Sequence, residues 1–405
     1  MASDFDVARR DYPALEGTVF LNSASMGMVS ASALAALEAE LGILAEGPRE
    51  LGWARYGERL ERGIGRARAE AARLVAASAE EIGLVTDTTG GLHGAIDAIP
   101  FRDGDNVVLS DLEYPQVALA ADNARRENGV EIRFVRHRGG RLTVDDYRCA
   151  IDSRTRAVLV SSVGWVTGQL LDLAGLSALA DERGFFLVVD AVQHLGGVSI
   201  DVSSLRIDFL VAGGYKWLCA PFGCGILFVR RGAHELGLRV RRLGLLGSSA
   251  PEEGWDAFYD SPRMVPLPGL EPEQSVRRFE AQGTPNRFGA VGLAAALEHR
   301  NQFAADAVDR HIRALGALLI ESLAARGATV WTPVDEAERA GIVSFTFGEG
   351  PSADKRLHAF LESRKIFTSA RWCSGVGGVR LAVHLYNSPA DVDALVSALD
   401  DFRGR

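Results

Sequence analysis

The stretch DFLVAGGYKWLCAP, residues 208–221, joins a short apolar run to a glycine pair and one lysine. Lysine is rare here, because Lys216, Lys355 and Lys365 are the only three among 44 lysine and arginine residues. A lysine amine can lose its proton and act as a nucleophile, whereas arginine keeps its charge. Lys216, desolvated after a buried strand, can form a Schiff base. Taken alone, it also fits a surface lysine at a loop end.

Apolar runs like the one before Lys216 recur from about residue 80 and alternate with amphipathic runs. They predict strands at 81–86, 106–110, 131–136, 155–163, 185–190, 208–214 and 224–230, with helices at 92–99, 115–128 and 175–183. Continuous β-branched runs between helices are typical of a mainly parallel sheet covered on both faces. The sequence therefore predicts an α/β fold with a large domain of this kind.

Prolines interrupt the pattern between residues 248 and 287, which indicates loop and linker. Residues 288–326 are strongly helical, and strands are predicted at 328–332, 342–347, 366–372 and 379–385, before a last helix at 389–403. We expect a large domain over residues 18–265, a linker over 266–284, and a smaller α+β domain. This smaller domain would combine residues 285–405 with residues 1–17.

Composition excludes several classes of protein. The formal net charge of −9 argues against a general nucleic-acid binder, which needs a basic surface. No apolar run approaches the roughly 18 residues of a membrane helix, so no membrane partner is expected. The four cysteines show no CxxC spacing, so neither a disulfide framework nor a metal site is expected. The N-terminus has no apolar signal core, and we expect a cytoplasmic protein.

Three other positions fall where strands of such a sheet end. Asp190 ends the run FFLVVD and would face the crevice where α/β sheets bind ligands. Pyridoxal phosphate needs a carboxylate there, on its ring nitrogen, although a helix-capping aspartate is the alternative. Thr89 and Gly90 open a helix and suit a phosphate, or are ordinary turn residues. Tyr114 could stack on a cofactor ring, or simply lie at the rim.

Together, in the order phosphate turn, aromatic, aspartate and lysine, these residues resemble the class V aminotransferase family of fold-type I pyridoxal-phosphate enzymes. That family includes cysteine desulfurases, isopenicillin N epimerase-like proteins and C–S lyases. The resemblance extends from VFLNSASMG (19–27) to the segment 379–399. It implies pyridoxal 5′-phosphate as cofactor, a seven-stranded-type large sheet, an amino-acid substrate and a homodimer with shared active sites.

The resemblance also implies a role for each matching residue. Lys216 would hold the cofactor as a Schiff base, Asp190 would pair with its pyridine nitrogen, and Gln193 would approach its ring oxygen. Tyr114 would stack on the ring. The phosphate would be bound by Thr89, Gly90 and Tyr215, and by Thr284 reaching the partner subunit's cofactor. Arg380 would grip the substrate carboxylate by a bidentate pair, with Asn22 contributing from the loop LNSASMG.

Two positions depart from the family pattern. Gly213 stands where desulfurases often have serine, and Trp165 replaces an asparagine that commonly bonds the ring oxygen. Because an indole cannot accept a hydrogen bond, Gln193 would carry that contact alone.

The reaction is less determined than the cofactor. A desulfurase needs a mobile thiol, but only six residues separate its candidate Cys373 from Arg380, so the loop looks too short. The favoured reaction is therefore a lyase-type one, such as β-elimination at a cysteine S-conjugate. An aminotransferase, a desulfurase, an epimerase and a decarboxylating or oxidative variant stay open. A decayed scaffold conflicts with Lys216, Asp190 and Arg380, and the lack of a strand-linked GxGxxG argues against a nicotinamide dehydrogenase.

Overall fold

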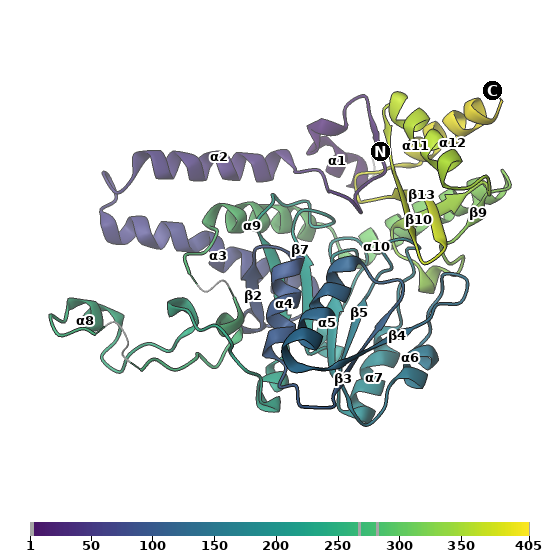
Figure 1. The fold of residues 1–405 in the computed structure, drawn as a ribbon. Coiled ribbons are helices and arrows are strands. Elements are labelled where there is room, and N and C mark those ends of the chain that lie inside the picture. The colour runs from purple at the N-terminus through teal and green to yellow at the C-terminus, as the bar shows by residue number, and fades with distance from the viewer. Residues whose placement is uncertain (1–3, 266–268, 281–282, 405) are drawn as a thin grey trace.

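The computed structural model describes residues 4–265, 269–280 and 283–404. Its centre is a seven-stranded sheet in the order β2-β8-β7-β6-β5-β3-β4 (Figure 1). These strands are Ile82–Val85, Gly225–Val229, Phe209–Gly213, Phe186–Asp190, Thr155–Ser161, Asn106–Ser110 and Glu131–Val135. The pairs from β7 through β6, β5 and β3 to β4 are parallel, and β8 alone in this sheet runs antiparallel to both neighbours. The predicted mainly parallel sheet is confirmed.

Side chains of the central strands alternate between two apolar cores, one on each face of the sheet. In β6, Leu187 and Val189 join one core, whereas Phe186 and Val188 join the other. This is why the strands read as unbroken apolar runs, since both faces are buried. The first core is covered by α3 (Trp53–Val75), α6 (Val144–Ala150), α7 (Leu173–Arg183) and α9 (Arg287–Asn301), and the second by α4 (Thr88–Ala98) and α5 (Pro115–Asn128).

The helices α2 (Ala31–Glu46) and α3 both extend from the same side of the molecule (Figure 1). The amide of Ala33 donates to the Ser30 hydroxyl at the start of α2, and Gly47 ends the helix with φ of 63°. Helix α9 packs against both of them and is buried over most of its length.

A second, antiparallel sheet has the order β12-β13-β10-β9, formed by Ser369–Cys373, Val376–Ala382, Ile342–Thr346 and Thr329–Val330. Its core also contains residues of α10 (Ala305–Ala324), α11 (Pro351–Ser363) and α12 (Pro389–Arg403). The N-terminal segment joins this core through Ala8 of α1 (Asp4–Arg10) and through Tyr12. Strand β1 (Val19–Phe20) pairs with β11 (Ile366–Phe367), so both ends of the chain build the smaller unit.

The predicted boundary at residue 285 falls before α9, whose apolar side chains pack in the core of the large sheet. Much of the expected linker is irregular, with a short 3-10 turn at Val276–Phe279, while residues 266–268 and 281–282 lie outside the described residues. Before it comes α8 (Trp255–Asp260). The remaining 3-10 turns are Pro13–Leu15, Ala79–Glu81, Val202–Ser204, Arg231–Leu236, Leu245–Gly247 and Glu336–Glu338.

None of the helices in the described part of the chain is long and apolar enough to cross a membrane.

Candidate active site

Asp190 lies at the carboxyl end of β6, between the ends of two parallel neighbours. The residue is only 4% exposed, and its Oδ1 accepts a hydrogen bond of 2.9 Å from the Val192 amide. Burial raises the pKa of this carboxyl to about 6, against the lowering effects of the Val192 amide and of Lys216. Within the described chain, no residue donates a hydrogen bond to Oδ2.

Lys216 follows β7 and reaches the same crevice. It is 9% exposed, and burial lowers the pKa of its amine to about 8, while Asp190 opposes the shift. Its Nζ lies 5.6 Å from the ring centre of Tyr114 and 5.7 Å from that of Tyr215. Among the described residues it forms no ion pair within 4 Å. A buried amine without a nearby carboxylate is typical of a lysine that forms a covalent bond rather than an ion pair.

The backbone carrying Lys216 is packed tightly against the N-terminal loop. The Gly27 amide donates to the Tyr215 carbonyl at 2.9 Å, and a Cβ on Gly27 would lie 1.9 Å from the Lys216 carbonyl oxygen. Only glycine permits this approach. Cys219 closes the turn in the left-handed region with φ of 54°. The position of the lysine is therefore fixed from both sides.

Gln193 is buried with both ends of its amide engaged. Its Nε2 donates to the Ala24 carbonyl at 3.0 Å, and its Oε1 accepts from the Trp217 indole at 2.7 Å. The predicted ring-oxygen contact would thus depend on the second Nε2 hydrogen. Trp217, which the sequence did not single out, ties the lysine turn to Gln193 and to the pocket loop.

The predicted phosphate turn is the start of α4. Its N-cap Asp87 accepts a 2.8 Å bond from the Gly90 amide, so that amide is already occupied. The Thr88 hydroxyl accepts from the Gly213 amide at 2.9 Å and joins the turn to the end of β7. Thr89 is half-buried. Burial raises the pKa of Tyr215, and the charge of Asp87 adds to this effect. A carboxylate at this helix end is an addition that the resemblance did not predict.

Arg380 lies in β13 and is 3% exposed. Its guanidinium donates to the Trp165 carbonyl at 2.8 Å, to the Ser25 hydroxyl at 2.8 Å and to the Ser369 hydroxyl at 3.1 Å. No carboxylate of the described chain lies within 4 Å of it. Burial lowers its pKa to about 9, and the charge of Arg371 adds to that effect. A buried guanidinium held by neutral groups is suited to an anion from outside the chain.

The pocket loop lies beside this arginine. Asn22 bridges to Ala382 in β13, and its Oδ1 is buried without a hydrogen-bond partner. The Trp165 ring meets Tyr114 edge-on, with ring centres 5.2 Å apart, and its indole donates to the Leu112 carbonyl. Trp165 therefore helps to wall the pocket, and it also presents the carbonyl that Arg380 uses.

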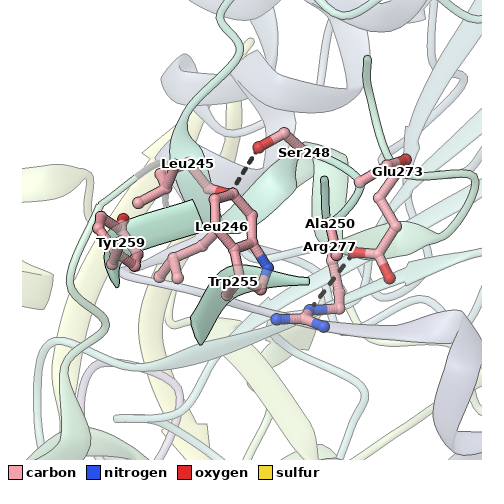
Figure 2. A pocket seen from close by; sticks show the side chains of 9 residues that line it. Leu245, Leu246, Ser248, Ala250, Trp255, Tyr259, Glu273 and Arg277 are labelled. Atoms are coloured by element: carbon pink, nitrogen blue, oxygen red, sulfur yellow. Dashed lines mark hydrogen bonds and ion pairs between the residues drawn. The ribbon is translucent and has the colours of Figure 1, made fainter. Parts of the chain in front are cut away.

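Thr284 does not join this group within the chain. It is exposed and lines a separate cavity of about 550 Å³ with Leu246, Trp255 and Arg287. Its predicted contact with a partner subunit's cofactor stays a prediction. A neighbouring cavity of about 540 Å³ is lined by Leu245, Leu246, Ser248, Ser249, Ala250, Trp255, Tyr259, Glu273 and Arg277 (Figure 2). Its lining includes neither Lys216 nor Asp190 nor Arg380, so we exclude this cavity as the active site.

The residues at the crevice fit pyridoxal phosphate. A buried amine, a buried carboxylate with an unengaged oxygen, an aromatic ring near the amine and a helix N-terminus lie around the end of one sheet. These supply a Schiff-base nitrogen, a partner for a protonated ring nitrogen, a stacking surface and amide donors. The described residues hold no group of three or more His, Cys, Asp or Glu side chains arranged for a metal ion.

Cys373 ends β12 in a two-residue hairpin. Ser374 and Gly375 form the turn with φ of 47° and 86°, and Cys373 pairs directly with Val376. The hairpin tip is tethered, because the Ser374 hydroxyl donates to the Asp111 carbonyl at 2.7 Å and His137 contacts the Ser374 carbonyl at 3.0 Å. The Cys373 thiol itself lies 3.5 Å from the Asp111 carbonyl, and burial raises its pKa.

The chain is similar to known proteins over most of its length. The model of the family described as "Aminotransferase class-V" matches residues 19–395. A cysteine desulfurase of Salmonella gallinarum is 28% identical over 347 residues, which cover 82% of this chain and 80% of the relative. An apo cysteine desulfurase structure from Thermococcus onnurineus NA1 has a TM-score of 0.85 at 22% identity and covers 100% of this chain and 99% of that one. A cystine C–S lyase, solved with its reaction product cysteine persulfide, has a TM-score of 0.84 at 22% identity, covering 96% and 99%.

Proposed function

The chain belongs to the class V aminotransferase family, and on that premise we propose that it is a lyase that breaks the Cβ–S bond of a cysteine S-conjugate. As a member of the family it is a pyridoxal-phosphate-dependent enzyme. The observation that carries the proposal is the Cys373 thiol, which is fixed in a hairpin, while Lys216 supplies a buried amine whose pKa is lowered to about 8. The amine supplies the proton transfer of an elimination, while the thiol lacks the freedom that a sulfur carrier needs.

Bound pyridoxal phosphate would supply an electron sink for the charge that develops at the substrate Cα. Asp190 would keep the ring nitrogen protonated by pairing with it, since its buried side chain leaves Oδ2 without a hydrogen-bond donor among the described residues. Lys216 Nζ would take the proton from Cα as general base, a role favoured by an amine whose pKa is lowered to about 8. Loss of the thiolate would then leave a product that water converts to pyruvate and ammonia.

Arg380 would orient the substrate by its α-carboxylate. Ser25, Ser369 and the Trp165 carbonyl hold the guanidinium from three directions, which limits its movement. Because no carboxylate of the described residues lies within 4 Å of Arg380, the substrate anion would be the one that neutralises this buried charge. Trp165 and Tyr114 would exclude water from the reacting carbons.

Cysteine desulfurase activity is the second candidate, favoured by the 28% identical relatives. It would require Cys373 to reach the substrate sulfur and carry a persulfide. The tethered turn argues against this, because moving the thiol would break the contacts at Asp111 and His137 and the pairing with Val376. A neighbour of the same fold is described as a cystine C–S lyase, so C–S bond cleavage is compatible with this scaffold.

The test is a mass-spectrometric product profile of the purified holoenzyme with L-cysteine, several S-alkyl cysteines, and an amino acid paired with a 2-oxo acid. We expect thiol, pyruvate and ammonia from the S-conjugates. Cys373→Ser should keep this activity within about two-fold, whereas Lys216→Arg should lose it by roughly 10²–10⁴-fold. Lys355→Arg is the matched control for the lysine change.

Two outcomes would overturn the proposal. A new amino acid formed from the oxo acid would make the protein an aminotransferase. Alanine and enzyme-bound persulfide from L-cysteine, lost in Cys373→Ser, would make it a desulfurase.

A further inference from the structure

One face of the β12–β13 hairpin carries two arginines. Ser369 pairs with Arg380 and Arg371 pairs with Gly378, so the register places Arg371 on the same face as Arg380. The Arg380 guanidinium confirms this face by donating to Ser369. Two residues along a strand span about 7 Å, which sets the spacing of the two positions along the hairpin.

This face is turned toward the active-site crevice. Cys373 lies on it, two residues beyond Arg371, and contacts the Asp111 carbonyl of the loop that leads to Tyr114. The opposite face packs elsewhere, since the Lys355 amine of α11 lies 5.8 Å from the ring centre of Trp372. Arg371 is therefore positioned between the carboxylate site at Arg380 and the hairpin tip.

Arg371 has no carboxylate of its own. It is exposed, its Nη1 donates to the adjacent Ala370 carbonyl at 2.8 Å, and within the described residues it forms no ion pair within 4 Å. Asp111 of the facing loop is already engaged, because its side chain contacts Arg136 and accepts from the His137 amide. The charge of Arg371 is close enough to Arg380 to lower the pKa of that guanidinium.

Two unpaired cations facing one pocket repel each other unless anions fill the space between them. One substrate carboxylate on Arg380 leaves the second charge unmatched. Arg371 lies two residues further along the hairpin, toward its tip. An anionic group at the far end of the substrate side chain would therefore neutralise its charge.

We infer that Arg371 binds an anionic group on the leaving side of the substrate, so that the preferred substrates are cysteine S-conjugates whose thiol carries a carboxylate. This inference rests on the proposed lyase function. Arg371 thus determines specificity, while Arg380 anchors the α-carboxylate that all amino acids share.

The test compares S-carboxymethyl-L-cysteine with S-carbamoylmethyl-L-cysteine, which replaces the distal carboxylate by an amide of nearly the same shape. For the wild-type holoenzyme we expect kcat/KM to favour the carboxylate by about ten-fold to a hundred-fold, as for a hydrogen bond to a charged group. Arg371→Gln should remove the preference by weakening the carboxylate alone. Arg356→Gln, an exposed arginine on α11, should leave it unchanged.

A second pair separates binding from chemistry. L-2-Aminoadipate and its side-chain amide have carbon in place of sulfur and cannot eliminate a thiol, so their dissociation constants report the subsite alone, read from the cofactor absorbance. If aminoadipate binds more tightly and Arg371→Gln abolishes the difference, the subsite holds even when no elimination product forms, and only the lyase proposal fails.

Two results would overturn the inference. An equal loss for carboxylate and amide in Arg371→Gln would make Arg371 a second ligand of the α-carboxylate. Equal affinity of the wild-type holoenzyme for both members of the adipate pair would show that no distal anion is bound.

Discussion

Glu113 is the residue beside Tyr114, and its carboxyl group is buried at the end of the parallel strands. It accepts from the Ser110 hydroxyl at 3.1 Å and from the Ser161 amide and hydroxyl at 3.0 and 2.5 Å. Burial raises its pKa to about 7, against the lowering effect of Ser161, and Asp190 adds to the rise. Glu113 thereby joins the ends of β3 and β5 below the predicted stacking ring.

A raised carboxyl pKa makes stability depend on pH with a definite sign. Between its unfolded value near 4.5 and about 7, the folded state keeps a proton that the unfolded state has released. Stability contributed by this group therefore falls as pH rises through that window. The free energy of unfolding of Glu113→Gln lacks this pH dependence. We therefore expect it to rise relative to that of the wild type by on the order of 2 kcal/mol between pH 5 and pH 8.

Thermal unfolding midpoints of the two holoenzymes at both pH values measure this effect. Glu298→Gln, which removes an exposed partner of Arg66, is the control and should show no such trend. If the unfolding midpoints of Glu113→Gln and the wild type differ by the same amount at pH 5 and at pH 8, the prediction is wrong.

At the same scale, sequence reasoning identified residues by the strand that each one follows. This found Asp190 and Lys216, because buried apolar runs mark strand ends. It missed Glu113 and Trp217, whose contacts join segments distant in the sequence. Nor did it foresee that Gln193 would be engaged at both ends of its amide.

Among the elements, the bounds of helices and strands were predicted well where the periodicity is regular and less well where glycines interrupt it. Helix α5 spans Pro115–Asn128 as predicted, with the proline at its start and Gly129 ending it. The strand predicted over 379–385 instead covers Val376–Ala382, because Gly377 and Gly378 continue the pairing with β12. Beyond it, His384 turns out of the strand, where its amide bonds the Asn387 side chain.

The hairpin between β12 and β13 depends on its turn. Gly375 has φ of 86°, a region that costs other residues about 1–2 kcal/mol. We expect Gly375→Ala to lower the free energy of unfolding by about that amount. Because the hairpin carries Arg371 and Arg380, KM for an amino-acid substrate should rise as well.

Denaturant unfolding and steady-state kinetics measure the two effects. Gly57→Ala is the matched control, since Gly57 lies inside α3 with no atom within 4 Å of an added Cβ. This change should raise the free energy of unfolding by about 0.5–1 kcal/mol. An unchanged stability and KM in Gly375→Ala would show that the turn tolerates another geometry.

Across the whole molecule, the candidate active site lies where the two sheets meet, and the contacts that bring these sheets together were not predictable from sequence. Periodicity gave the two sheets separately. It could not assign α9 to the large core, since an apolar helix shows that it is buried without showing against what. The joint itself is made by residues 22–27, 193, 217 and 384, which come from four separate parts of the chain.

His384 is the residue of this joint that links Arg380's strand to the lysine turn. Its Nε2 lies 2.8 Å from the Trp217 carbonyl, and its Nδ1 accepts from the Leu385 amide, so Nε2 carries the proton. The ring lies against Trp217 on one side and Tyr386 on the other, with centres 5.6 and 4.8 Å away. Burial lowers its pKa to about 3, which keeps the ring neutral across the physiological range.

We therefore expect His384→Phe to change activity as well as stability. Phenylalanine keeps the stacking but leaves the Trp217 carbonyl buried without a donor, at a cost of about 1–3 kcal/mol. Relief of that cost would shift the lysine turn relative to Arg380, and kcat/KM should fall at least ten-fold. The control is His358→Phe, which breaks a 2.9 Å contact with Thr368 inside the smaller unit. It should lower the unfolding midpoint and leave kcat/KM nearly unchanged, and equal losses of activity in both variants would mean that His384 supports the fold without aligning the site.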